Sequence, residues 1–334
     1  MKAVKKKVGA TRVWRGVIAC LHSIMGECRQ NAPPDVPWRT QLNGQETMQK
    51  EASNRTVSAP LVSTEWLAER LGHANLAVVD ASWYLPAMKR DGRAEYASAH
   101  IPGAVFFDID AVSDHSTDLP HMLPTEAQFA AAMGALGINE EMEIVVYDGA
   151  GLFSAPRVWW MLTIFGARSV HALDSGLPKW RAEGRPIGSG APAPAPASFS
   201  ARLDAAAVAT FEDVRAALEV RSAQVADARP GARFRGEAPE PRADIPSGHM
   251  PGAASLPASD MIADGRLKSP EAVLAAFALA GVDPDAPLIT SCGSGVSAAI
   301  LNLALAASGK PQPRLYDGSW TEWAARNAPV ATSG

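Results

Sequence analysis

Residues 289–300, ITSCGSGVSAAI, pass from an apolar run into a cysteine, two closely spaced glycines and a run of small apolar residues. The apolar residues before Cys292 predict a buried strand, and the small residues after the glycines predict a helix. Gly293 and Gly295 permit the backbone angles of a tight strand-to-helix turn. The stretch therefore predicts an α/β unit with a cysteine at the junction of a strand and a helix.

The chain before this stretch has the same alternation of strand-like and helix-like segments. Strand-like runs are LAVVDAS (76–82), EIVVYD (143–148) and VHALD (170–174), and helix-like runs are STEWLAERLG (63–72) and TEAQFAAAMGALG (125–137). Each helical run begins with a Ser or Thr cap and has a Glu close behind it. This alternation predicts an α/β fold with a mainly parallel sheet.

The landmarks of the first half return in the second half in the same order. HIPGA (100–104) is followed by HMPGA (249–253), Asp80 by Asp227, Asp148 by Cys292, and LDSGLPKW (173–180) by LYDGSWTEW (315–323). Four landmarks repeated about 145 residues later indicate a duplicated domain. Because one copy has Asp148 where the other has Cys292, we expect thiol chemistry only in the second half.

Composition sets the domain boundaries and excludes several classes of protein. GSGAPAPAPAS (188–198) has no core-forming period and predicts a semi-rigid linker between domains at 58–187 and 199–334. The net charge of −4 gives no basic footprint for nucleic acid. Three cysteines are too few and too scattered for a disulfide framework, and no metal site is expected, so a reducing cytoplasm fits best.

Residues 1–57 differ from the rest of the chain. They begin with a basic stretch, then carry a short interrupted apolar run and a polar, proline-bearing stretch without period. The apolar run is too short for a membrane span, which needs about 20 residues. We expect a disordered or mis-annotated extension, with a weak organelle-targeting signal as the alternative.

Several motifs are similar to the signatures of one family. YASAHIPGAVFF (96–107) and YDGSWTEW (316–323) resemble the two signatures of the rhodanese superfamily of sulfurtransferases, and APRVWWML (155–162) resembles the inactive first domain of its tandem two-domain members. The resemblance covers about residues 58–330 and implies two tandem rhodanese-like domains, each a mainly parallel sheet flanked by helices. The sequence departs from the family pattern at Ser297, where Thr is usual, and at Pro313.

The turn around Cys292 suits a sulfur nucleophile. A thiol attacks as its thiolate, and a free cysteine with a pKa of ~8.5 is only slightly ionised at neutral pH. We expect the backbone N–H groups of an active-site loop made of Gly293, Ser294, Gly295, Val296 and Ser297, with the positive end of the following helix, to stabilise a thiolate or persulfide at Cys292. A buried, inert cysteine is the alternative. The sixth residue after Cys292 is Ala298 and not Arg, which excludes a phosphatase loop.

The identity of the sulfur donor depends on charge. The loop CGSGV resembles that of the 3-mercaptopyruvate sulfurtransferases, whereas thiosulfate-using rhodaneses have cations in this loop. The resemblance implies that Arg233 and Arg242 clamp the α-keto acid of 3-mercaptopyruvate, a role that suits the planar guanidinium fork. Solvated surface arginines are the alternative, and we expect that state for Arg235.

The resemblance also implies a proton relay made of Ser294, His100 and Asp91, which would protonate the pyruvate enolate. The alternative is that His100 and its repeat equivalent His249 only hold their turns. The sequence thus predicts a sulfurtransferase that forms a persulfide on Cys292, releases pyruvate and passes sulfur to cyanide or a thiol such as thioredoxin, without metal or organic cofactor. A thiosulfate:cyanide sulfurtransferase and a non-catalytic rhodanese-fold scaffold are the alternatives.

Overall fold

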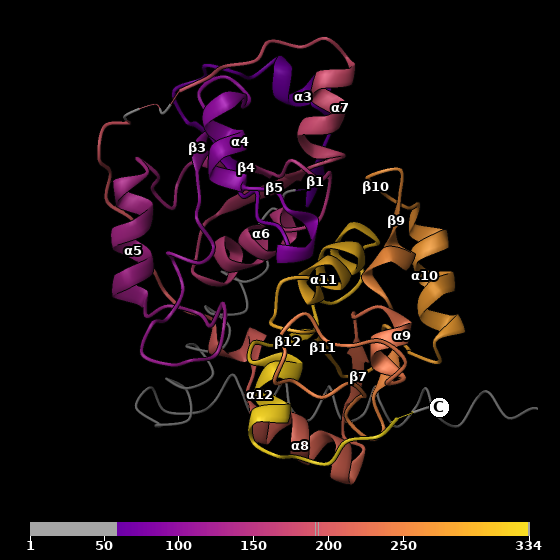
Figure 1. Ribbon diagram of the computed structural model, residues 1–334. Coiled ribbons are helices and arrows are strands. Elements are labelled where there is room, and N and C mark those ends of the chain that lie inside the picture. The colour runs from indigo at the N-terminus through magenta and orange to yellow at the C-terminus, as the bar shows by residue number, and fades with distance from the viewer. Residues whose placement is uncertain (1–58, 191, 193, 333–334) are drawn as a thin grey trace, which may run out of the picture. The chain divides into compact units, whose positions relative to one another are not determined.

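Two five-stranded parallel sheets organise the chain in the computed structural model, which describes residues 59–190, 192 and 194–332 (Figure 1). Residues from Ser58 onward form one unit by their contacts. The predicted extension at 1–57, with Cys20 and Cys28, lies outside the described residues.

The first half of this unit builds one sheet with strand order β1-β5-β4-β2-β3, in which all neighbouring strands are parallel. Its elements are β1 (Leu61–Val62), α3 (Thr64–Ala68), β2 (Leu76–Asp80), the 3₁₀ helix η1 (Pro86–Met88), α4 (Gly92–Ser98), β3 (Val105–Phe106), α5 (Glu126–Ala135), β4 (Glu143–Tyr147), α6 (Ala155–Ile164), β5 (Ser169–Leu173) and α7 (Gly176–Ala182).

The second half repeats this topology with strand order β6-β12-β11-β7-β8, again with parallel neighbours. Its elements are η2 (Ala205–Ala207), β6 (Val208–Ala209), α8 (Phe211–Val220), β7 (Gln224–Asp227), α9 (Gly231–Phe234), β8 (Ala254–Ser255), η3 (Ala258–Met261), β9 (Ile262–Ala263), β10 (Arg266–Leu267), α10 (Pro270–Leu279), β11 (Leu288–Ser291), α11 (Ala298–Ala307), β12 (Arg314–Tyr316) and α12 (Ser319–Ala325). Strands β9 and β10 form a separate antiparallel pair.

Alternating side chains of the strands pack on the two faces of each sheet. In β4, Ile144 and Val146 join the core that includes α5 and α6, whereas Val145 and Tyr147 join the core that includes α3, α4 and α7. This period of two follows from the pleat of a strand, and apolar residues on both faces are typical of parallel sheets covered by helices. The prediction of an α/β fold with mainly parallel sheets flanked by helices is therefore confirmed.

The helix starts follow the capping signals in the sequence. The Ser63 side chain accepts a hydrogen bond from Trp66 N at the start of α3, and Thr125 forms a capping box with Gln128 at the start of α5. Such caps satisfy N–H groups that have no partner inside the helix. No helix in the described part of the chain is long and apolar enough to cross a membrane.

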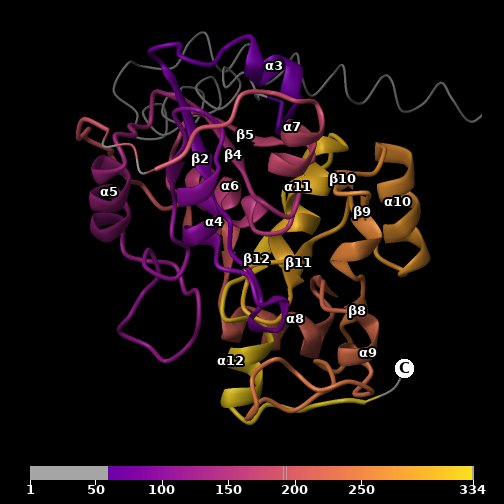
Figure 2. The ribbon, with the colours of Figure 1, turned by 45° about the horizontal axis from the view of Figure 1, so that its top comes forward.

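Helices α6 and α11 pack against each other and join the two halves through a shared apolar core (Figure 1). Figure 2 shows the same arrangement from a second direction, with α5 and α10 on the outer sides of the two halves. Trp159 and Trp160 of α6 are buried in this shared core. The core brings loops of the first half close to the carboxyl edge of the second sheet, where Cys292 lies.

Candidate active site

Cys292 directly follows β11, the central strand of the second sheet. Its side chain is a free thiol, and the residue is 1% exposed. Ligand sites of open parallel sheets form outside the carboxyl ends of the strands, which is the position of this thiol. Helix α11 begins at Ala298 after an N-cap at Ser297, so the predicted junction between strand and helix is present.

Helix α12 holds the loop after Cys292 in place. The N–H groups of Cys292 and Gly295 both donate to Ser319 Oγ at 3.1 Å. The hydroxyl of Thr321 donates to Gly293 O at 2.7 Å. Gly295 has a φ of +78°, and a side chain at this position would collide with the Arg157 guanidinium. Glycine is therefore required at Gly295 by both backbone angle and space.

The first half shows what a loop of this kind does for an anion. Asp148 follows β4, the central strand of the first sheet, and is fully buried. One of its oxygens, Oδ2, accepts hydrogen bonds from the backbone N–H groups of Phe153, Ser154 and Ala155 at 2.7, 2.9 and 2.8 Å. Its other oxygen accepts from Ala150 N at 2.8 Å. A turn of this class thus stabilises a negative charge with main-chain donors alone.

Ser294 in the Cys292 loop contacts a histidine of the first half, which in turn contacts an aspartate. The distance between Ser294 Oγ and His121 Nδ1 is 2.9 Å, and the distance between His121 Nε2 and Asp110 Oδ1 is 3.0 Å. Trp83 Nε1 donates to the second oxygen of Asp110 at 3.0 Å, and the Trp83 ring lies edge-on to His121. The hydrogen bond from His121 holds the pKa of the Asp110 carboxyl below its ordinary value, against the effect of burial. An ionised Asp110 orients the imidazole of His121 towards Ser294.

The prediction that His100 and Asp91 form this relay is corrected by the geometry. His100 Nδ1 lies 2.8 Å from Tyr96 O, and its ring stacks on the Tyr96 ring. Asp91 caps α4 by accepting from Ala94 N at 3.0 Å. These contacts hold His100 within its own turn. Its repeat equivalent, His249, makes the corresponding contact with Phe234 O and stacks on the Phe234 ring.

His121 and Asp110 could have been found from a different signal in the sequence. His121 lies in the segment between β3 and α5, and it does not belong to any landmark that the two halves share. A histidine that occurs in one copy of a repeat only is not needed by the common fold, so it is a better candidate for the reaction than a histidine repeated in both copies.

The predicted substrate arginines differ in their surroundings. Burial lowers the pKa of the Arg242 guanidinium, and its electrostatic interactions with Cys292, Asp110 and Glu240 oppose this effect, so Arg242 lies near these groups. Within the described residues no hydrogen bond to the Arg242 side chain is found. Arg233 forms an ion pair with Glu240 at 3.3 Å and keeps 18% of its side chain exposed. Arg235, by contrast, pairs with Glu237 on the surface.

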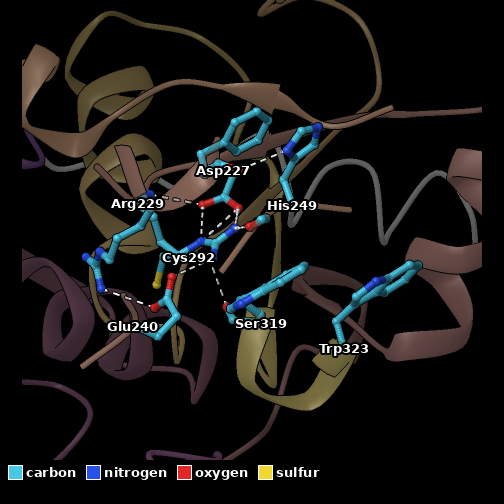
Figure 3. A network of polar contacts seen from close by, with 12 residues as sticks. Asp227, Arg229, Glu240, His249, Cys292, Ser319 and Trp323 are labelled. Carbon is cyan, nitrogen blue, oxygen red and sulfur yellow. Dashed lines mark hydrogen bonds and ion pairs between the residues drawn. The ribbon is translucent and has the colours of Figure 1, made fainter. Parts of the chain in front are cut away.

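A third arginine, which was not predicted from the sequence, is buried beside Asp227 and Glu240 (Figure 3). Arg229 is 0% exposed and binds Asp227 at 2.7 Å and Glu240 at 2.8 Å. Burial acts to lower the pKa of Arg229, but the two carboxylates raise it above its ordinary value. Since Glu240 contacts both Arg229 and Arg233, it connects the buried ion pair to the exposed arginine.

The first half also contributes a buried cation to the site. Arg157 of α6 is fully buried and pairs with Asp317 at 2.7 Å. Its Nη2 donates to the carbonyl of His121 at 2.6 Å, and Leu123 N donates to the other oxygen of Asp317 at 2.7 Å. These contacts fix the segment that carries His121 against the second half. The structure therefore brings Cys292, Ser294 and Arg242 together with His121 and Asp110, and it places His100 and Asp91 elsewhere.

The chain is similar to known proteins of one family. The family model of the rhodanese-like domain matches residues 63–183 and 210–326. The human 3-mercaptopyruvate sulfurtransferase is 46% identical over 276 residues, which cover 80% of this chain and 93% of the human protein. A thiosulfate sulfurtransferase of Cricetulus griseus is 44% identical over 271 residues, 79% of this chain and 91% of that protein.

A solved structure shows the same fold. The crystal structure of SseA from Escherichia coli, a 3-mercaptopyruvate sulfurtransferase, superposes with a TM-score of 0.73 at 42% identity, over 79% of this chain and 99% of that chain. Both repeats of the sequence match the family model, and the match extends over more than half of the chain. The chain therefore belongs to the rhodanese family, as a sulfurtransferase with two rhodanese-like domains in tandem.

Proposed function

We propose that this enzyme takes sulfur from 3-mercaptopyruvate, carries it as a persulfide on Cys292 and passes it to a thiol. The observation that carries the proposal is the set of groups near the thiol: a chain of contacts from Ser294 through His121 to Asp110, together with the Arg242 guanidinium. A substrate with a carboxylate, a carbonyl and a terminal thiol needs both a cation and a proton donor. No cation lies in the Gly293–Gly295 part of the loop.

In the first step the Cys292 thiolate attacks the sulfur of 3-mercaptopyruvate. A sulfur–sulfur bond forms, the carbon–sulfur bond breaks, and its electron pair stays on carbon as the enolate of pyruvate. The charged His121 supplies a proton through Ser294, which gives pyruvate and leaves a persulfide on Cys292. The main-chain donors of the loop stabilise the negative sulfur as the equivalent loop stabilises the Asp148 carboxylate.

In the second step the neutral His121 takes the proton of the incoming thiol. The resulting thiolate attacks the outer sulfur of the persulfide, leaves as a new persulfide and regenerates the Cys292 thiolate. A small thiol or the exposed thiol of a protein such as thioredoxin would serve as acceptor. We further propose a cytoplasmic location, because three scattered cysteines favour a reducing compartment.

Thiosulfate is the second candidate donor, because one of the similar proteins is named for it and Arg242 places a cation near the thiol. Rates measured with each donor on the same preparation distinguish the two. We expect a higher kcat/KM for 3-mercaptopyruvate, and a preference for thiosulfate would contradict the proposal.

Replacing the arginines tests the binding of the carboxylate. Arg233→Ala and Arg242→Ala should each lower kcat/KM for 3-mercaptopyruvate by about ten- to a hundred-fold, since a charge-assisted hydrogen bond contributes roughly 1.5–3 kcal/mol. Arg235→Ala is the matched control and should have little effect. Equal losses with both donors would mean that the arginines serve the fold and not the substrate.

A further inference from the structure

A cavity of about 350 Å³ lies at the carboxyl edge of the first sheet, in the half that lacks the cysteine. Its lining includes Asp80 at the end of β2, Ser82 just after it, and Leu177 and Arg181 of α7. The volume is within the range of small-molecule sites, about 300–1,000 Å³. None of these residues contributes to the proposed reaction at Cys292.

The repeat allows each wall of the cavity to be compared with the second half. Ser82 N donates to Asp80 Oδ1 at 2.9 Å, and Arg229 N donates to Asp227 Oδ1 at 3.0 Å, so Ser82 and Arg229 are equivalent. In α7, Trp180 Nε1 donates to Pro186 O, and in α12, Trp323 Nε1 donates to Pro329 O. Trp180 and Trp323 are therefore equivalent. Leu177 and Trp320, which each lie three residues before these tryptophans, are equivalent as well.

Both equivalent positions carry a larger side chain in the second half. There the Arg229 guanidinium binds Asp227 through Nε and Nη2 and lies over the Trp320 ring at 4.4 Å (Figure 3). In the first half the aspartate is retained, but serine replaces the arginine and leucine replaces the tryptophan. The cavity is therefore the space in which the second half holds its own guanidinium and indole.

Asp80 has no cation as a partner within the described residues. It is 1% exposed, and burial raises its pKa to about 6, with hydrogen bonds from Ser82 and Tyr147 opposing the rise and the charge of Asp148 adding to it. Of the two arginines in the lining, Arg90 is already neutralised by two hydrogen bonds to Glu95, and Arg181 is exposed. The Asp80 carboxylate is therefore left without an ion pair.

We propose that this cavity is a second ligand site, which binds a small molecule carrying one guanidinium group, with the guanidinium on Asp80 as Arg229 lies on Asp227. The flat cation would donate two parallel hydrogen bonds to the carboxylate, the geometry that makes this pair specific. The site goes beyond sulfur transfer and uses residues of the non-catalytic half only.

Methylguanidinium chloride is the probe, titrated into the full chain at constant ionic strength with calorimetry or protein-detected NMR. We expect saturable binding in the millimolar range at pH 7.5, tighter than that of methylammonium, which cannot form the bidentate pair. Binding should weaken as the pH falls from 7.5 to 5, because protonation of Asp80 removes the anion. Binding that does not change with pH, or no binding at all, would overturn the proposal.

Three variants locate the probe. Asp80→Asn should weaken binding about tenfold or more, since it removes the charge. Ser82→Arg should abolish binding, because the new side chain supplies the guanidinium from within the protein. Arg181→Ala, the control on the rim, should leave binding unchanged or tighter. Loss of binding in Arg181→Ala with unchanged binding in Asp80→Asn would show that the probe does not lie on Asp80, and unchanged binding in Ser82→Arg would place it elsewhere; each result contradicts the proposal.

Discussion

Asp148 and Cys292 occupy the same position in the two halves, directly after the central strand of each sheet. Both are followed by a turn with a glycine in the left-handed region, Gly151 in one half and Gly295 in the other. The turn stabilises a carboxylate in the first half, so its affinity for negative charge is a property of the fold. The two turns differ in the groups beside them, because His121, which is paired with Asp110, contacts Ser294 of the second turn.

The candidate site is built from residues of both halves. The second half supplies the thiol and the arginines, and the first half supplies the relay and Arg157, which donates to the carbonyl of His121. We therefore expect the half that lacks its own nucleophile to be required for the reaction. The predictions below test this division, from the largest expected effect to the smallest.

Replacing the nucleophile should have the largest effect. Cys292→Ser should abolish sulfur transfer, because a serine hydroxyl cannot carry a persulfide, and mass spectrometry after treatment with 3-mercaptopyruvate should show one added sulfur on Cys292 in the unaltered protein. Cys20→Ser and Cys28→Ser are the controls and should retain activity. Asp148→Cys in the Cys292→Ser background should stay inactive; recovered activity would mean that the turn alone is sufficient.

Removing the relay should lower kcat strongly. His121→Asn and Asp110→Asn should each lower kcat by about 10²–10³-fold, because a positioned acid–base group contributes on that scale. His100→Asn is the matched control, since it removes the repeated histidine that holds only its turn, and it should change stability more than kcat. A larger loss of kcat in His100→Asn than in His121→Asn would reverse the correction made from the geometry.

The two aspartates that end β7 and β2 should respond in opposite directions. Asp227→Asn leaves the fully buried Arg229 without its bidentate partner, and removing one member of a buried pair costs about 3–5 kcal/mol. The free energy of unfolding at pH 7.5, measured in urea, should fall accordingly. Asp80→Asn removes no ion pair and should not lower it by a comparable amount.

The smallest effect is the pH dependence of Asp80. Its pKa of about 6 in the folded protein exceeds the ordinary value of 3.8, so the folded state loses stability as the pH rises through this interval and the carboxyl ionises. Asp80→Asn cannot ionise and should be more stable than the unaltered protein at pH 7.5, by up to about 2–3 kcal/mol. The advantage should shrink towards pH 4.5. An advantage that grows on acidification would show that the burial of Asp80 has been misjudged.

The fold could be predicted from the sequence because the repeat provides two independent copies of each structural signal. Each landmark appears in two copies, and apolar runs such as those of β4 and β11 are too short for helices and too apolar for loops. The Cys292 turn could be predicted for a related reason: its glycines and its position between a strand and a helix are local features. Local features of this kind can be recognised from neighbouring residues alone.

The relay could not be predicted in this way, because it depends on contacts across long distances in the chain. His121 and Ser294 are 173 residues apart, and His121 lies outside every motif that the two halves share. Resemblance to a family directed attention to the repeated His100, whose stacking on Tyr96 becomes visible only in three dimensions. The role of Arg229 could not be predicted, because a sequence does not distinguish a buried arginine from a solvated one.

The hold of α12 on the Cys292 loop has a consequence for the synthesis of the chain. A nascent polypeptide that ends at Cys292 already contains the thiol, His121, Asp110 and the arginines Arg229, Arg233 and Arg242. It lacks Ser294, and it lacks Ser319, which receives the N–H groups of Cys292 and Gly295. We therefore expect the loop to take its shape only after Ser319 has been synthesised. Products truncated before Ser319 would carry Cys292 without the contacts that shape its loop. We expect such products to be unable to transfer sulfur.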